Sequence, residues 1–242
     1  MPNTSKIAII AALEREVRDL VAGAEVRHIQ TTGRKLPIYL LGDVSIVCAG
    51  IGGEAAGKAS EAMIQHVRPD LIISVGFAGA ADPALGIGGI VVPRIVIDVE
   101  SGQRFSTMHG EGVLVSARGI ATSEQKRSLR EKYQALAVDM EAAAVAERAT
   151  AHGTQFMAIK SISDRSGATL PDFSSFVRDS GQFATIPFLL HMIFHPTLWP
   201  ELRKLAVDTG IAAKSLTSAL RPSVMDGSFL RAADSKQAIN SR

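Results

Sequence analysis

Short runs of consecutive apolar residues recur along the chain and constrain its fold more than any other feature. Ile7–Ala11, Val44–Ala49 and Leu71–Val75 are rich in β-branched residues and carry no charge. Strands that are apolar on both faces are typical of a parallel sheet with helices on both sides. Helical stretches such as Glu14–Val21 and Glu54–His66 separate the runs. The sequence therefore predicts an α/β fold, a single-domain three-layer arrangement around a twisted, mostly parallel mixed sheet.

The rest of the pattern extends this arrangement. The dipeptides Thr32-Gly33 and Gly42-Asp43 interrupt the stretch from Ala24 to Cys48 and predict hairpins. Pro93 within the run Gly89–Val99 predicts an edge strand or a bulge, because proline cannot donate to a ladder. The further predicted elements are the helices Ser123–Tyr133 and Glu141–His152 and the strands Ala135–Asp139 and Phe156–Ser163.

A single domain is predicted over residues 1–220, with a loose tail over 221–242 because Pro, Ser, Asp and Gly recur there. Residues 183–220 are predicted to form an apolar helical extension of the domain. Its apolar side chains recur at helical spacing, at Phe183, Ile186, Leu189, Leu190, Ile193 and Phe194. Such a face could be core, a subunit interface, a cover for an apolar substrate, or a weak membrane-surface contact.

Composition excludes several classes of protein. The formal charge is +2, from 26 basic and 24 acidic residues, which gives no support for nucleic-acid binding driven by charge. A single cysteine, Cys48, cannot form an intrachain disulfide and favours a reducing, cytoplasmic location. No segment has the pattern of a signal peptide or a membrane span. We therefore expect a globular protein of the cytoplasm.

Acidic and glycine-rich motifs follow several predicted strands. Glu14 and Glu16 follow the first strand, Met140-Glu141 follows Asp139, and Ser163-Asp164 closes the strand from Phe156. In open α/β sheets, ligands bind beyond the carboxyl ends of the strands. Each acid taken singly also fits the first turn of a helix, where it would complement the helix dipole. Together, the acids indicate a working site at this edge of the sheet.

The turn Gly50-Ile51-Gly52-Gly53 lies between a predicted strand and a predicted helix. Such a turn can hold a phosphate at the helix N-terminus, with Gly52 and Gly53 as candidate phosphate-binding residues. The acid about 20 residues further on, Asp70, begins the next strand rather than ending it, so the dinucleotide fingerprint is poor. A tight strand-to-helix turn is the other interpretation. An NAD-binding or non-catalytic α/β module thus remains an alternative.

Several motifs, in order, resemble one enzyme family. They are Ile9-Ile10-Ala11-Ala12-Leu13-Glu14-Arg15-Glu16-Val17, Ala49-Gly50-Ile51-Gly52, Gly76-Phe77-Ala78-Gly79, Gly86-Ile87-Gly88-Gly89-Ile90-Val91-Val92, Val138-Asp139-Met140-Glu141-Ala142-Ala143 and Ser161-Ile162-Ser163-Asp164. Over Lys6–Gly167 the chain is similar to nucleoside phosphorylases and methylthioadenosine/S-adenosylhomocysteine nucleosidases. The resemblance implies cleavage of the N-glycosidic bond of an adenine nucleoside, without a cofactor or a metal, by a homo-oligomer.

The resemblance also implies roles for individual residues. Asp164 would protonate N7 of the leaving purine, and Glu16 would orient and deprotonate an attacking water. Glu141 would hold the ribose hydroxyls, and Met140, unless it is plain core, would pack on the sugar. The further implied substrate-binding residues are Phe77, Ala78, Gly79 and Ser163. Arg165 is a further candidate phosphate-binding residue, or simply a surface arginine.

Two positions depart from the familiar members of the family. Ser74 and Phe77 stand where phosphorylases place an arginine and a serine on phosphate. The version with Phe77, together with the C-terminal block, resembles the hopanoid-associated branch, which implies an adenosylhopane-like substrate with a large apolar 5′ group. A methylthioadenosine/S-adenosylhomocysteine nucleosidase is the alternative. Whether phosphate or water is the nucleophile stays open at this point.

Overall fold

A computed structural model of the chain describes residues 6–32, 34–168 and 199–226. In this part of the chain, one sheet has the strand order β2-β3-β4-β1-β5-β10-β9-β7-β8, and β11 pairs with β5 and with β6. The strands are β1 (Ile7–Ala11), β2 (Glu25–Thr31), β3 (Arg34–Leu41), β4 (Val44–Cys48), β5 (Leu71–Ala80), β6 (Ile90–Val91), β7 (Ile95–Asp98), β8 (Arg104–Ser106), β9 (Val113–Ser116), β10 (Ala135–Asp139) and β11 (Gln155–Asp164). The predicted hairpins are confirmed, since β2, β3 and β4 pair antiparallel.

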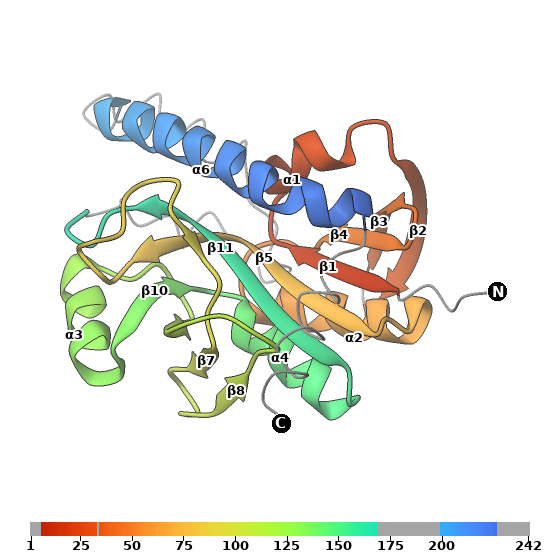
Figure 1. The fold of residues 1–242 in the computed structure, drawn as a ribbon, viewed down its shortest axis with the longest axis horizontal. Helices are drawn as coiled ribbons and strands as arrows, with labels where there is room; N and C mark the ends of the chain where they lie inside the picture. Colours follow the sequence, from red (N-terminus) through yellow and green to blue (C-terminus); the bar gives the residue numbers. More distant parts are fainter. Residues whose placement is uncertain (1–5, 33, 169–198, 227–242) are drawn as a thin grey trace, which may run out of the picture.

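Helices cover both faces of the sheet (Figure 1). On one face, α1 (Glu14–Val21) and α6 (Trp199–Asp226) contact each other and the central strands. On the other face, α2 (Gly53–Val67) and α4 (Ala142–Ala151) form a second layer, while α3 (Ser123–Tyr133) packs on β10. The strands β1, β4, β5, β7, β9, β10 and β11 form five parallel pairs among themselves. The predicted three-layer α/β fold with a mostly parallel mixed sheet is therefore confirmed.

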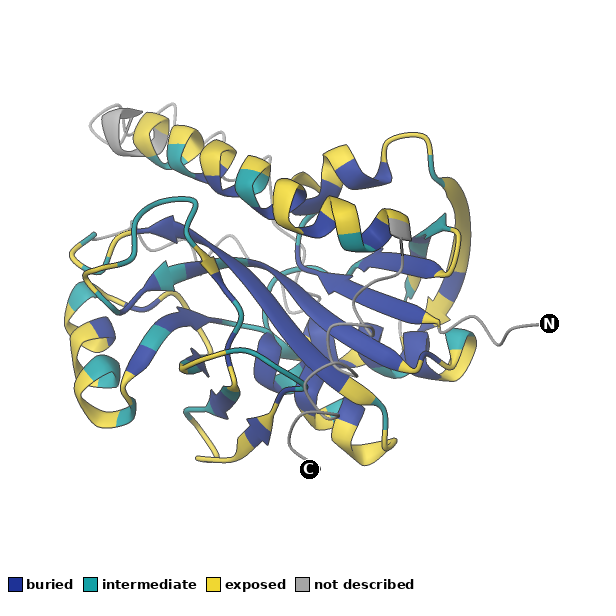
Figure 2. Ribbon diagram, in the orientation of Figure 1, coloured by how far each residue is buried: buried dark blue, intermediate teal, exposed yellow. Residues whose placement is uncertain are grey.

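The apolar strands explain why both faces need cover. Side chains alternate along a strand, so Ile72 joins the cluster under α2 and α4, whereas Ile73 joins the cluster under α1 and α6. Figure 2 shows the central strands almost wholly buried between the helices. Residues 203–208 of α6 include no fully buried side chain, and the helix packs onto the sheet through a later stripe of Ala212, Leu216, Leu220 and Val224.

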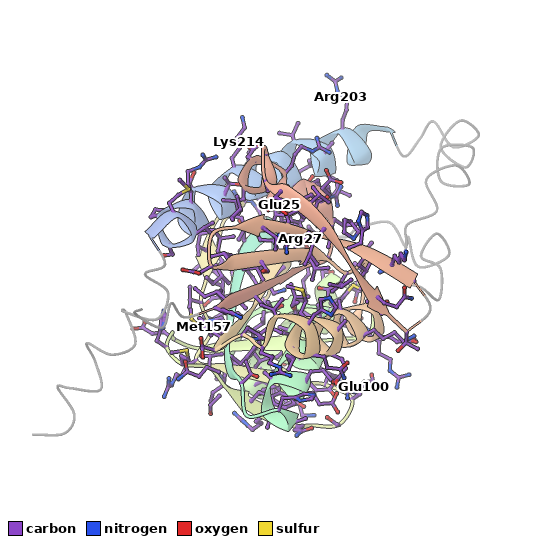
Figure 3. All side chains as sticks on the ribbon, turned by 90° about the vertical axis from the view of Figure 1, so that its right-hand side faces the viewer. Glu25, Arg27, Glu100, Met157, Arg203 and Lys214 are labelled. Atoms are coloured by element: carbon purple, nitrogen blue, oxygen red, sulfur yellow. The ribbon has the colours of Figure 1, made fainter. Side chains whose placement is uncertain are left out.

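The side of the sheet opposite α3 is polar. The hairpin strand β2 presents Glu25 and Arg27 to solvent, where the two side chains form an ion pair of 2.8 Å (Figure 3). Arg203 points outward from α6 in the same view, and Lys214 is also exposed. Exposed pairs of this kind contribute little to stability. These charges therefore mark solvated faces.

The strand β5 is longer than the sequence suggests. We predicted a strand over Leu71–Val75, but the strand runs on to Ala80. The reason is that both of its edges are paired there, by β11 along residues 76–79 and by β10 at Gly79 and Ala80. Gly76 adopts φ +143°, a conformation that L side chains rarely adopt. The glycine motif is thus part of the sheet and lies at its centre.

Two further segments bear on the expectations from sequence. Pro93 lies in the gap between β6 and β7, so the single run predicted over residues 89–99 is two short strands. At the C-terminus, α6 continues through Pro222 to Asp226, six residues into the tail predicted to be loose. The apolar residues 183–194 and the tail residues 227–242 lie outside the described residues. Among the described helices, none is long and apolar enough to cross a membrane.

One feature of the topology creates the site. β1 pairs with Leu71–Ser74 of β5, and β10 pairs with Gly79 and Ala80. Since β11 occupies the opposite edge of β5, β1 and β10 share one edge. β1 is parallel to β5 and β10 antiparallel, so their carboxyl ends point toward each other beside residues 75–78. The acids that follow β1 and β10 are consequently brought to one place.

Candidate active site

Glu16 occupies the space at the end of β1. Its carboxylate accepts backbone N–H groups from Ala12 (2.9 Å) and Leu13 (3.0 Å), and the residue is only 3% exposed. A Cβ added to Gly76 would lie 3.1 Å from Glu16 Oε2, so the carboxylate packs directly against the backbone of β5. Glu16 is therefore held rigidly at the centre of the sheet edge, as a predicted catalytic base should be.

Glu141 approaches from the end of β10 and joins the glycine turn to the site. Its Oε1 accepts the N–H of Gly52 at 2.8 Å, and its Oε2 accepts the N–H of Met140 at 3.3 Å. Gly52 has φ +95° and is the N-cap of α2. A helix N-terminus favours an anion, and here the anion at the turn is a carboxylate of the chain itself.

A buried lysine lies behind these two acids. Lys160 of β11 is 0% exposed, and its Nζ lies 2.9 Å from Asp139 Oδ2 and donates to Ser74 Oγ at 3.0 Å. Asp139 also accepts the hydroxyl of Ser116 at 2.5 Å and the N–H of Ala142 at 2.9 Å, which fixes the start of α4. Ser74 thus belongs to this network.

Burial sets the ionisation of the cluster. Burial raises the pKa of Glu16, against backbone hydrogen bonds and Lys160, which lower it. The pKa of Glu141 rises to about 7, chiefly through burial and in spite of Lys160. Burial alone would lower the pKa of Lys160, but its carboxylate neighbours, Asp139 first, raise it above its ordinary value. Lys160 therefore favours its charged form, whereas burial makes Glu16 and Glu141 resist losing their protons.

We expect the variant Glu141→Gln to change how stability depends on pH. Between pH 4.5 and about 7 the folded protein holds a proton on Glu141 that the unfolded chain releases, so the wild type loses stability as pH rises through this window. The loss is at most on the order of 3 kcal/mol. Gln cannot ionise, so the Tm of the variant relative to the wild type should rise by several degrees from pH 5 to pH 8. A Tm difference that is independent of pH would contradict the raised pKa.

Asp164 lies across β5 from these residues, at the end of β11. Its Oδ1 accepts the hydroxyl of Ser163 at 2.8 Å, and its Oδ2 forms an ion pair with Lys126 of α3. Asp164 is opposite Gly79 in the register, and Ser163 Oγ also reaches the carbonyl of Ala78 at 3.4 Å. The predicted residues Ala78, Gly79, Ser163 and Asp164 therefore form one group around the end of β5.

The remaining predicted residues lie around this core. Phe77 is partly buried, and the guanidinium of Arg15 lies 5.7 Å from its ring centroid. Met140 is also partly buried, and its carbonyl would lie 3.5 Å from a Cβ at Gly53. The described contacts do not join Arg165 to the glycine turn: its side chain is exposed, and its carbonyl accepts from Lys126. Arg34 reaches the turn instead, by donating to the carbonyl of Ala49.

Comparisons with known proteins identify the family of the chain. A family model described as the phosphorylase superfamily matches residues 6–119 and 100–186. The chain belongs to the phosphorylase superfamily. It is therefore an enzyme of the nucleosidase and phosphorylase type. It is 29% identical over 200 residues to a 5′-methylthioadenosine/S-adenosylhomocysteine nucleosidase from Bacillus pumilus, which covers 67% of this chain and 87% of the relative.

Solved structures share the fold of this superfamily member. A methylthioadenosine/S-adenosylhomocysteine nucleosidase from Colwellia psychrerythraea, in complex with adenine, gives a TM-score of 0.61 at 22% identity over 88% of this chain and 95% of that one. Futalosine hydrolase from Helicobacter pylori gives a TM-score of 0.64 at 19% identity, over 90% of this chain and 98% of that one. At these identities the likeness shows the fold.

The superfamily motifs did not lead us to three residues of this site. Lys160 stands alone among apolar residues within a buried strand, and an isolated charge in such a strand predicts a buried partner. That signal could have identified it. Ser116 and Lys126 give no comparable signal, because a serine at a strand end and a lysine on a polar helix are ordinary surface residues in sequence.

Proposed function

We propose that the protein cleaves the N-glycosidic bond of an adenine nucleoside. The observation that carries this proposal is the placement of two acids at the two ends of residues 76–79 of β5. Glu16 packs against Gly76, and Asp164 packs against Gly79. Three residues of strand span roughly 10 Å, so the two acids stand well apart along β5. The names of the curated relatives and the bound adenine of the Colwellia nucleosidase support adenine as the base.

Each acid has a distinct part in this reaction. Asp164 protonates N7 of the purine, so that the base leaves neutral as the C1′–N9 bond breaks. Glu141, which is joined to Gly52, accepts the ribose hydroxyls through charge-assisted hydrogen bonds. Glu16, with its raised pKa, takes the proton of the attacking nucleophile. The transition state has oxocarbenium character, as in sugar hydrolysis, and the buried carboxylates stabilise it.

We propose water as the nucleophile. Glu16, Glu141 and Asp139 place three carboxyl groups around one buried ammonium, and each of them that is ionised repels a phosphate dianion. Two groups that could hold phosphate are engaged, since the N–H of Gly52 binds Glu141 and the hydroxyl of Ser74 accepts from Lys160. Phosphate is the second candidate, and Arg34 beside the glycine turn is the observation that favours it.

We propose that the 5′ substituent is large and apolar, as in adenosylhopane. Phe77, Ser161 and Ile90 are register neighbours on β5, β11 and β6, so their side chains leave the same face of the sheet. Ile211 of α6 contacts the loop just before Ile90, at Gly88, and both isoleucines are exposed. An alkyl group bound there would gain about 25 cal/mol per Å² of apolar surface removed from water.

The test is adenine release from adenosines with 5′-alkylthio chains of increasing length, assayed with and without phosphate. We expect kcat/KM to rise with chain length and to be independent of phosphate. Ile211→Ser should flatten the trend, whereas the control Val26→Ser, an exposed apolar residue on β2, should not. A preference for methylthioadenosine would favour the ordinary nucleosidase. A strict requirement for phosphate would overturn water as the nucleophile.

A further inference from the structure

Lys126 is a buried cation that has no role in the reaction proposed above. It lies on α3 and is 2% exposed, and its ammonium forms an ion pair with Asp164, which is 6% exposed. The same ammonium donates to the carbonyl of Arg165 at 3.1 Å. A lysine is almost never fully buried unless it is paired, because removing an ammonium from water is costly. The burial of Lys126 therefore depends on its pairing with Asp164, the predicted acid.

Contacts on both sides of the Lys126–Asp164 pair fix its position. The helix α3 begins with a capping box between Thr122 and Gln125, and Arg130 of the same helix bonds Asp82 at 2.9 Å, just after β5. On the strand side, a Cβ at Gly79 would lie 2.9 Å from Asp164 Oδ2 and 2.9 Å from Lys126 Cε. Gly79 therefore provides the space for the pair, and no larger residue fits there without displacing it.

The hydrogen bonds of Asp164 bear on how it could act as an acid. Its Oδ1 accepts from the Ser163 hydroxyl, and its Oδ2 accepts from the Lys126 ammonium. A carboxyl group that accepts on both oxygens is engaged as the carboxylate, which has no proton of its own to give. If Asp164 protonates N7 of a purine, the proton has to come from a neighbour, and the ammonium on Oδ2 is in contact with it.

We propose that Lys126 is a positioning residue that acts through Asp164 to protonate the leaving base; the inference rests on the proposed function. As the C1′–N9 bond breaks, its electron pair goes to N9, and Asp164 hands on to N7 a proton that it receives from Lys126. That proton passes from the ammonium of Lys126 to Oδ2 of Asp164, so the carboxylate is regenerated once N7 is protonated. The lysine is left as a neutral amine and regains a proton from water, which completes the proton balance.

A double-mutant cycle tests this inference. Lys126→Met and Asp164→Asn are each expected to lower kcat/KM for the nucleoside by roughly 100-fold or more, the usual range for general acid catalysis. If Lys126 acts only through Asp164, the double variant should be no worse than Asp164→Asn alone. Lys132→Met, an exposed lysine on the same helix, is the matched control and should keep wild-type activity. Losses that multiply in the double variant would overturn the inference.

Two further measurements separate proton transfer from structural damage. 4-Nitrophenyl riboside needs no proton on its leaving group, so its cleavage should fall by less than about 5-fold in Lys126→Met. Equal losses on both substrates would show a structural role. Lys126→Arg keeps the positive charge but releases no proton, so it should stay as slow on the nucleoside as Lys126→Met. Full activity with arginine would overturn the proton transfer.

The proposed function is tested separately, by base release from the wild type. If the wild type releases no base from any nucleoside, the proposed function fails before any variant is compared. If the wild type releases base but the cycle is additive, only the role of Lys126 fails. Thermal unfolding of each variant, with the double variant as the charge-neutral reference, shows whether the single variants are folded.

Discussion

Asp164→Asn is expected to remove at least about 99% of base release and to destabilise the protein at the same time. The kinetic loss follows because an amide cannot pass a proton to the purine. The loss of stability follows because Lys126 is left as an unpaired ammonium in a site where it is 2% exposed. Breaking a buried ion pair from one side typically costs about 3–5 kcal/mol. Urea unfolding and adenine release measure the two effects.

The two effects should separate when the lysine is removed as well. Lys126→Met in the Asp164→Asn background eliminates the unpaired charge, so most of the lost free energy of unfolding should return. Turnover should stay low, since no acid is restored. If Asp164→Asn alone leaves the free energy of unfolding unchanged, the pair contributes nothing to stability and the buried contact is wrong.

Lys160→Met is expected to have the second large effect, a loss of stability that depends on pH. Lys160 is the cation that lowers the pKa of both Glu16 and Glu141, so its removal raises those pKa values further above their ordinary range. A carboxyl with a raised pKa stabilises the fold most when protonated, and this contribution is lost as pH rises. The deficit should therefore approach about 3–5 kcal/mol at pH 8 and shrink toward pH 5.

Urea unfolding at pH 8 and pH 5 provides the measurement for Lys160→Met. The control is Lys58→Met, which removes an exposed lysine paired with Glu54 on α2. Its free energy of unfolding should change little at either pH, because exposed pairs are screened by water. A deficit for Lys160→Met that is the same at both pH values would show that the neighbouring carboxyls do not take up protons, contrary to the argument from their burial.

The fold class follows from local features of the sequence. Charge-free, β-branched runs such as Ile7–Ala11 cannot face water on either side, so they require helices on both faces of a sheet. The limits of α1 and α3 also agree with the prediction, because turn and capping residues act within a few positions. The predicted end of β5 was wrong, because β10 and β11, which come later in the chain, pair with its glycines and keep them extended.

The candidate site divides in the same way. By itself, the sequence determined which acids follow strands, and the resemblance to the family then selected Glu16, Glu141 and Asp164 among them. Only the tertiary structure decided what those acids contact. Glu141 meets Gly52 across 89 residues, and Asp164 meets Lys126 across 38. Such contacts depend on the register of β10 and β11 against β5, which local propensity does not encode. The neighbours of each acid come together only when the strands of the sheet are assembled.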